Sequence, residues 1–144
     1  MIDFSPSPEQ KEWVAIAQRF ATEIVIPAAE RADRIAKPDQ AFDWQVIREA
    51  SKRGLRTLSV PKEFGGGGAD VLTLAMVGEQ IAYGDLGLAV AFDQSWKIMT
   101  ALSHLTNDEQ RKRWIPRVVE DPEFLLGVGA TEPLHASDNL LPYD

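Results

Sequence analysis

The sequence predicts an all-α fold: a bundle of about five helices with one strand at its C-terminal end. Three observations lead to this prediction. Apolar residues recur at intervals of three and four over roughly the first 120 residues, as on the buried face of a helix. Capping residues and helix breakers separate these runs. After residue 123 a short continuous apolar run bounded by turn formers replaces this period, which is typical of a strand.

The composition is that of a soluble globular domain, with 144 residues of which 44% are hydrophobic and 26% charged. The net charge of -7 argues against nucleic acid, whose phosphates need a basic face. The absence of cysteine excludes disulfides and thiolate metal sites. No apolar run is long enough to span a bilayer, and the first residues do not resemble a signal peptide. We therefore expect a cytoplasmic protein without nucleic-acid or membrane partners.

The first predicted helix begins at Pro8. Ser7 and Gln10 form a capping box around it, and proline suits the first helical position because its missing N–H would be unpaired there. Pro27 cannot continue the helix undisturbed, so we expect a bend at that point. The apolar face of this helix consists of Trp13, Ile16, Ala17, Phe20 and Ile24.

The second predicted helix is capped by Asp43 and ends before Gly54, a residue suited to the left-handed turn that follows many helices. Its predicted buried face is Trp44, Ile47 and Ala50. Residues 55–63 predict an extended or turn connection. The four glycines at 65–68 cost too much conformational entropy for a helix interior, and no lysine follows them as in a phosphate-binding loop. We expect a tight structural loop there.

Asp70 caps the third predicted helix, which Gly84 and Asp85 end. The fourth predicted helix, residues 86–104, is apolar nearly all round, so we expect it to be central, with other helices on every side. The predicted inner face of the third helix consists of Val71, Leu74, Ala75, Gly78, Ile81 and Ala82.

Asn107 and Gln110 form a second capping box, which begins the fifth predicted helix. Residues 120–122 end this helix. The apolar run 124–131 then predicts a single strand, which cannot be stable alone and would enter a sheet that this sequence does not contain. We therefore divide the chain into a helical domain, residues 1–123, and the start of a β-domain, residues 124–144. The apolar face of the fifth helix consists of Trp114, Ile115, Val118 and Val119.

Few residues suggest chemistry. The two histidines, His104 and His135, have no metal-site spacing, so we expect no metal. A polar interruption of the fourth helix is a candidate ligand slot, although its polar groups can equally be satisfied within the bundle. It consists of Gln94, Ser95, Trp96 and Met99.

The segment 129–139, GATEPLHASDN, is rich in hydroxyls and turn formers. It is either a simple turn with an Asx cap or a cluster of donors that binds an anion or a heteroaromatic edge.

Four pieces of the chain resemble the N-terminal region of the acyl-CoA dehydrogenase family. Residues 20–28, FATEIVIPA, resemble its F-A-x-E-x-I-x-P-x segment, and residues 54–66 resemble its G-L-x-x-x-x-V-P-E-E-Y-G-G loop. Residues 107–116, NDEQRKRWIP, resemble its T-E-E-Q-K-x-x-Y-L-P helix, and residues 129–138 resemble T-E-P-G-A-G-S-D. Together these pieces extend over most of the chain.

The resemblance implies an FAD-dependent enzyme that forms the α,β double bond of an acyl-CoA thioester. It implies a helical N-terminal domain, a middle β-domain, a C-terminal bundle and a homo-oligomer. The implied cofactor-binding residues are Val128, Ala130, Thr131 and Ser137. Ser137 also lies near the substrate in the family, and we expect the other substrate-binding residues to be Gln94, Ser95, Trp96 and Met99.

Two departures from the family pattern concern function. The family's G-A-G before the serine is replaced by Leu134, His135 and Ala136. The Cβ atoms of Leu134 and Ala136 can obstruct the close approach to a flavin that glycine allows, and His135 adds a titratable group. The family's catalytic base, a glutamate in the C-terminal bundle, has no counterpart here, so we expect no catalytic residue, no activity and no retained FAD in this chain alone. The alternatives are a non-catalytic helical interaction module, or the same domain of a flavin monooxygenase or nitroalkane oxidase of the family.

Overall fold

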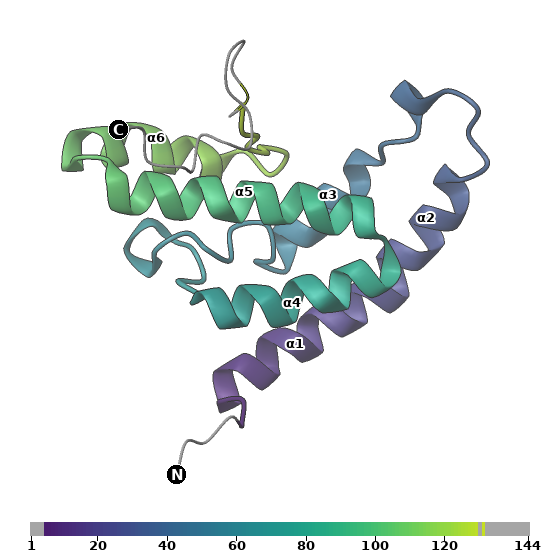
Figure 1. Cartoon of the computed structure of the whole chain (residues 1–144), viewed down its shortest axis with the longest axis horizontal. Coiled ribbons are helices and arrows are strands. Elements are labelled where there is room, and N and C mark those ends of the chain that lie inside the picture. Colours follow the sequence, from purple (N-terminus) through teal and green to yellow (C-terminus); the bar gives the residue numbers. More distant parts are fainter. Residues whose placement is uncertain (1–4, 130, 132–144) are drawn as a thin grey trace, which may run out of the picture.

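A computed structural model describes residues 5–129 and Thr131. This part of the chain is helical, contains no strand, and forms one bundle in which α4 and α5 lie side by side (Figure 1). None of its helices combines the length and apolarity that crossing a membrane requires. The α-helices are α1 (Pro8–Phe20), α2 (Ile26–Ala32), α3 (Trp44–Lys52), α4 (Val71–Gly84), α5 (Leu86–Leu105) and α6 (Asp108–Glu120).

A π-helical turn, η1 (Ala21–Val25), precedes the point where the sequence predicts a bend. The N–H of Ile26 donates to the carbonyl of Ala21, five residues earlier. Pro27 has no N–H to donate, and the wider turn accommodates the missing hydrogen bond. As a result α1, η1 and α2 continue as one rod in Figure 1, which leaves five helical rods in the described part of the chain, as predicted.

All four side-chain caps predicted from the sequence are formed. Ser7 and Asn107 make complete capping boxes, and Asp43 and Asp70 accept hydrogen bonds from amides of the first turn. The hydroxyl and the amide of Thr73 both donate to Asp70, and the hydroxyl is the main cause that lowers the pKa of that carboxyl. The caps explain why the predicted helix starts agree with the structure.

The main core lies where α1, η1, α3, α4 and α5 meet. Phe92 of α5 is at its centre, in edge-to-face contact with Phe20 at 6.4 Å and stacked on Trp96 at 6.0 Å between ring centroids. A second, smaller core lies between α5 and α6 and consists of Val60, Met99, Ile115 and Val118. Burial of these apolar side chains is the main contribution to the stability of the bundle.

Several residues predicted for the core are exposed instead. Trp44 is 46% and Trp114 is 43% exposed, while Val71 at the start of α4 is 75% exposed. The buried face of α4 is Thr73, Val77 and Ile81, because the Asp70 bonds hold Thr73 against the bundle. The fourth predicted helix, α5, is not surrounded on all sides.

Residues 55–60 form the predicted turn connection, and the glycine loop packs directly onto it. A Cβ on Gly66 would lie 2.3 Å from the carbonyl oxygen of Val60, and one on Gly67 would lie 2.8 Å from that of Leu58. Gly65 and Gly68 have positive φ, which other residues rarely adopt. The loop is therefore structural, as predicted.

A buried guanidinium joins this turn to α6. Arg56 is 4% exposed and donates to the carbonyls of Val118 (2.7 Å) and Phe124 (2.9 Å). Its Nε donates to Ser51 Oγ at 2.6 Å, and that oxygen lies 2.6 Å from the Pro122 carbonyl. One side chain thus satisfies carbonyls at the end of α6, where a helix leaves them unpaired.

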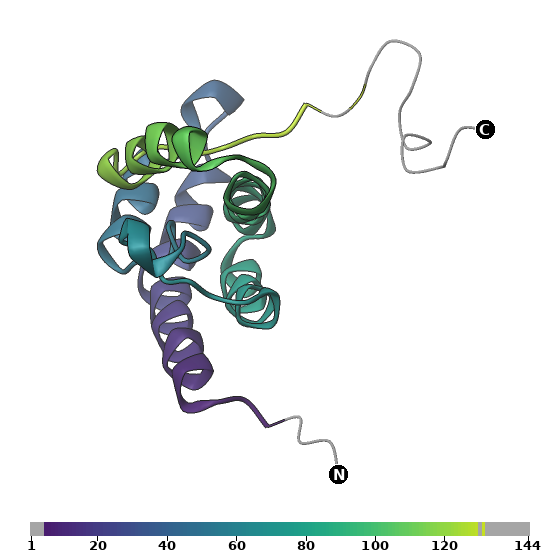
Figure 2. The same cartoon turned by 90° about the vertical axis from the view of Figure 1, so that its left-hand side faces the viewer.

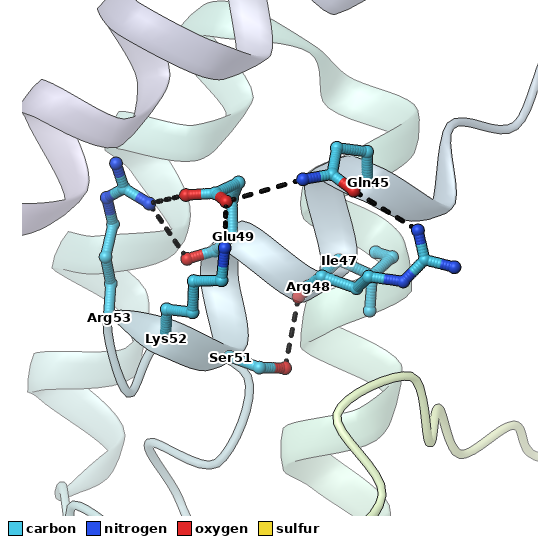
Figure 3. Close-up of polar contacts among 7 residues, drawn as sticks. All are labelled: Gln45, Ile47, Arg48, Glu49, Ser51, Lys52 and Arg53. Atoms are coloured by element: carbon cyan, nitrogen blue, oxygen red, sulfur yellow. Dashed lines mark hydrogen bonds and ion pairs between the residues drawn. The ribbon is translucent and has the colours of Figure 1, made fainter.

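The exposed side of α3 carries a charged network, shown in Figure 3. Glu49 accepts hydrogen bonds from Lys52 and Arg53, both at 2.6 Å. These bonds, the Lys52 bond first, hold the pKa of the Glu49 carboxyl below its ordinary value. Ser51, on the same helix, contacts the carbonyl of Ile47 at 3.0 Å.

The predicted strand is not formed between residues 124 and 129, which have no regular secondary structure. A strand is stable only when it is hydrogen-bonded to a neighbouring strand, and the described residues contain no strand with which this segment could pair. This segment leaves the bundle after α6 (Figure 2). We call residues 121–129 the exit segment.

We expect Arg56→Met to lower the free energy of unfolding by on the order of 3 kcal/mol, because several buried carbonyls lose a charged donor. Urea denaturation followed by circular dichroism measures this. Arg34→Met, at an exposed arginine whose side chain makes no hydrogen bond or ion pair with the described residues, is the control and should change little. Equal stability of both variants would contradict the importance assigned to Arg56.

We expect Gly66→Ala to destabilise the chain by about 2–3 kcal/mol, because the added methyl meets the backbone of Val60 and one chain must move. Gly127→Ala is the matched control, since a Cβ there meets nothing within 4 Å. The same denaturation measurement applies. A Gly66→Ala variant as stable as Gly127→Ala would show that the loop is not packed as described.

Candidate functional site

An open groove of about 500 Å³ runs between the antiparallel helices α4 and α5. Its wall on α4 is entirely apolar, and its wall on α5 is mixed. Because each helix turns its other side to the core, this groove lies on the outer side of the pair. The lining residues are Val71, Leu74, Ala75, Gly78, Leu86, Ala89, Val90, Asp93, Trp96, Lys97 and Thr100.

Small residues and one indole shape the groove. Ala75 and Gly78 on α4, opposite Ala89 on α5, leave space where larger side chains would fill it. A Cβ on Gly78 would be 3.7 Å from the Trp96 ring, so the indole forms the base of the hollow. Trp96 is held by its Nε1–H, which donates to the carbonyl of Leu55 at 2.9 Å. The base of the groove is therefore fixed by the core.

The α5 wall carries charge. Lys97 Nζ lies 2.5 Å from Asp93 Oδ2, an ion pair one helical turn apart whose side chains are both substantially exposed. Thr100 donates its hydroxyl to the carbonyl of Trp96 at 2.9 Å. The groove thus offers apolar surface along its length and a paired charge on one wall.

The four residues predicted to bind substrate all lie on α5, but the structure places them in different surroundings. Only Trp96 lines the groove. Ser95 is buried against the exit segment, and Met99 is buried in the smaller core. Gln94 is partly exposed and does not line the groove. Successive residues on a helix point about 100° apart, so Ser95 and Trp96 point to different sides of α5.

The periodicity of α4 predicts that its apolar residues lie in the core. The sequence pattern does not single out Val90, Asp93 or Lys97 as groove residues. A signal was present. A charged pair four residues apart inside an otherwise apolar helix marks a side that faces away from the core. Asp93 and Lys97 are that pair.

Several polar contacts hold the exit segment to the bundle before the predicted flavin contacts begin, and two of them come last along the chain. Arg56 binds the Phe124 carbonyl, and Ser95 binds the backbone of Leu126. Beyond them Val128 is 57% exposed, and Thr131 is exposed too. The remaining predicted site positions lie outside the described residues: Ala130, Leu134, His135, Ala136 and Ser137.

The backbone at the exposed end of this segment is accessible. Among the residues that the structure describes, the amides of Val128 and Gly129 make no hydrogen bond. A Cβ added to Gly127 or Gly129 would meet nothing within 4 Å, so the backbone there is open to a ligand. Amide donors and the Thr131 hydroxyl are the groups that the polar edge of an isoalloxazine ring requires.

The described residues contain no cluster of histidine, aspartate or glutamate that could hold a metal ion. His104 is exposed in the last turn of α5, where a positive charge interacts favourably with the helix dipole. Asp93 is the only carboxylate lining the groove within the described part of the chain, and Lys97 holds it as an ion pair.

Comparison with known proteins agrees with this arrangement. The chain is 28% identical over 137 residues to a probable medium-chain specific acyl-CoA dehydrogenase 2 of Caenorhabditis briggsae, covering 95% of the chain and 32% of that protein. It is 28% identical to an acyl-CoA dehydrogenase of Bacillus subtilis (90% and 33% covered) and to a 3-(aryl)acrylate reductase of Clostridium sporogenes (90% and 34%). The chain thus spans about a third of the length of these curated relatives.

The family model for the acyl-CoA dehydrogenase N-terminal domain matches residues 7–121, from the cap of α1 to the end of α6. This match covers most of the chain and every described helix. The chain therefore belongs to the acyl-CoA dehydrogenase family, in which residues 7–121 form the N-terminal helical domain.

Proposed function

We propose that this chain is the N-terminal part of an FAD-dependent oxidoreductase that introduces the α,β double bond into an acyl-CoA thioester. The observation that carries the proposal is the open apolar groove between α4 and α5. Its volume lies in the range of small-molecule sites, and its α4 wall suits a hydrocarbon chain. Each buried methylene would contribute about 0.8 kcal/mol to binding.

In this proposal the groove is one wall of the acyl pocket, with Trp96 at its base. The end of the exit segment and the residues after it supply flavin contacts through Val128, Ala130, Thr131 and Ser137. FAD, when bound, accepts the hydride. The Thr131 hydroxyl then donates to the ring edge where negative charge develops, which stabilises the transition state more than the ground state.

The described residues offer the groove no free carboxylate, because Asp93 is paired with Lys97. We therefore assign proton removal from the substrate to a residue outside this domain and expect this chain alone to be inactive. The division at residues 123 and 124 and a cytoplasmic location complete the proposal. The exit segment follows α6 without regular structure, which supports this division.

Exposed apolar side chains support a homo-oligomer or a further covering domain. Val71, Leu72, Tyr83 and Leu86 are 59–81% exposed on the α4–α5 side. Such a surface also favours the second candidate, a non-catalytic helical module that only packs against a partner. The decisive test, like the two variants below, uses a complete family protein that contains this chain: its FAD-loaded form is mixed with a panel of acyl-CoA thioesters, and flavin absorbance measures reduction. The module hypothesis expects a colourless protein and no reduction.

We expect Val90→Trp to fill the groove and lower kcat/KM for long acyl chains by about tenfold or more, with a smaller effect on short ones. The indole would displace about two to three methylenes of substrate from apolar surface. Steady-state kinetics across acyl lengths measures this. Leu105→Trp, at a side chain that is 84% exposed and does not line the groove, is the control. Equal effects of both variants would contradict the groove's role.

We expect Thr131→Val to slow flavin reduction by about ten- to hundredfold and to lower the flavin potential while FAD stays bound, because one donor to developing charge is lost. Stopped-flow absorbance and a redox titration measure the two quantities. Thr131→Ser keeps the hydroxyl and should retain most of the rate. A valine variant with unchanged rate and potential would leave Thr131 only a structural role.

A further inference from the structure

Ser95 makes a long-range contact that is needed neither for the hydrogen bonding of its own helix nor for the lining of the groove. Its Oγ accepts a hydrogen bond from the amide of Leu126 at 3.0 Å, although the two residues are 31 positions apart. The same oxygen lies 3.1 Å from the carbonyl of Ala91, one turn earlier in α5, and 3.4 Å from the carbonyl of Leu126. The residue is 5% exposed, so water does not compete.

A hydroxyl has one proton, which decides how these contacts work together. The shorter distance assigns that proton to the Ala91 carbonyl, which leaves the oxygen lone pairs for the Leu126 amide. Donation to a helix carbonyl makes the oxygen a better acceptor, since hydrogen bonds in a chain polarise one another. Ser95 therefore fixes the exit segment to the backbone of α5.

Leu126 is the last anchored point before the proposed flavin contacts. Within the described residues, no hydrogen bond holds the backbone after it. Val128 follows two residues later and Thr131 five residues later, at most about 18 Å of extended chain. The position of the Leu126 amide thus limits where the Thr131 hydroxyl can lie.

The next residue of α5 is Trp96, the base of the groove. The two side chains start about 1.5 Å apart along the helix axis and point to different sides of it. Trp96 is itself fixed by its bond to the Leu55 carbonyl. Two adjacent residues of the rigid helix α5 therefore connect the groove to the exit segment.

We propose that Ser95 is a positioning residue: by holding the Leu126 amide, it sets the flavin-contacting segment at a fixed place relative to the acyl groove. This inference rests on the proposed function, because it concerns the alignment of substrate and flavin. Ser95 was predicted from the sequence to bind substrate, and the geometry gives it this other task. Small errors in such alignment are costly to rate.

Ser103 provides a matched control. It lies on the same helix, is equally buried, and its hydroxyl donates to the Met99 carbonyl at 2.8 Å without contacting the exit segment. A Ser→Ala change at either position removes one oxygen atom and leaves the helix intact. Only Ser95→Ala leaves the Leu126 amide without its acceptor.

The experiment compares wild type, Ser95→Ala, Ser95→Thr and Ser103→Ala, each made in a complete family protein that contains this chain and each loaded with FAD. Hydrogen exchange measures protection of the Leu126 amide, and stopped-flow absorbance measures flavin reduction against acyl-CoA concentration. For Ser95→Ala we expect about tenfold faster exchange at Leu126, the effect of one lost hydrogen bond. We also expect a roughly tenfold lower reduction rate with little change in the acyl-CoA concentration at half-maximal rate. Ser95→Thr, which keeps the hydroxyl, should restore both, and Ser103→Ala should match wild type.

The outcomes separate the two proposals. If wild type is not reduced by any acyl-CoA, the proposed function fails and this inference fails with it. If wild type is reduced but Ser95→Ala and Ser103→Ala behave alike in exchange and in reduction, the inference alone is overturned. A Ser95→Ala variant with faster exchange and an unchanged reduction rate would also overturn it, because the anchor would then not serve alignment.

Discussion

The bundle depends on how Arg56 is buried. Its guanidinium lies in a turn, where it donates to carbonyls at the end of α6 and to the Phe124 carbonyl of the exit segment. Burial lowers the pKa of this group, while the charge of nearby Asp121 opposes the shift. Guanidinium remains charged even so, because its ordinary pKa is far above neutral. A buried charge must be fully hydrogen-bonded, so these carbonyls have to stay where they are.

The same turn joins the two cores. Leu55 and Leu58 belong to the main core, whereas Val60 belongs to the smaller core between α5 and α6. The glycine loop covers the turn from outside at distances that tolerate no Cβ on Gly66. Residues 55–68, which have almost no regular structure, therefore hold the helices in place relative to one another.

Helix α5 connects this framework to the candidate site. Trp96 binds the Leu55 carbonyl and lines the groove, and its neighbour Ser95 binds the exit segment. The site is thus positioned by backbone atoms of the turn and of the exit segment. Such contacts depend on main-chain geometry, and a side chain changed elsewhere on the surface leaves them intact.

The sequence by itself determined the helices, their caps, the glycine loop and the family. These features are local: Ser7 caps its own helix, and Gly54 adopts positive φ because of the turn that it makes. Family resemblance likewise resides in short motifs such as residues 54–66.

Only the tertiary structure decided which apolar residues are buried and what Ser95 and Arg56 do. Val71 and Ile81 lie on the same helix and are equally apolar, yet one is exposed and the other is core, because the direction in which α4 packs decides between them. The partners of Arg56 and Ser95 are up to 68 and 31 residues away. The periodicity of a sequence shows which face of a helix is apolar but not which helix packs against it. Contacts between residues far apart in the sequence therefore depend on how the helices pack.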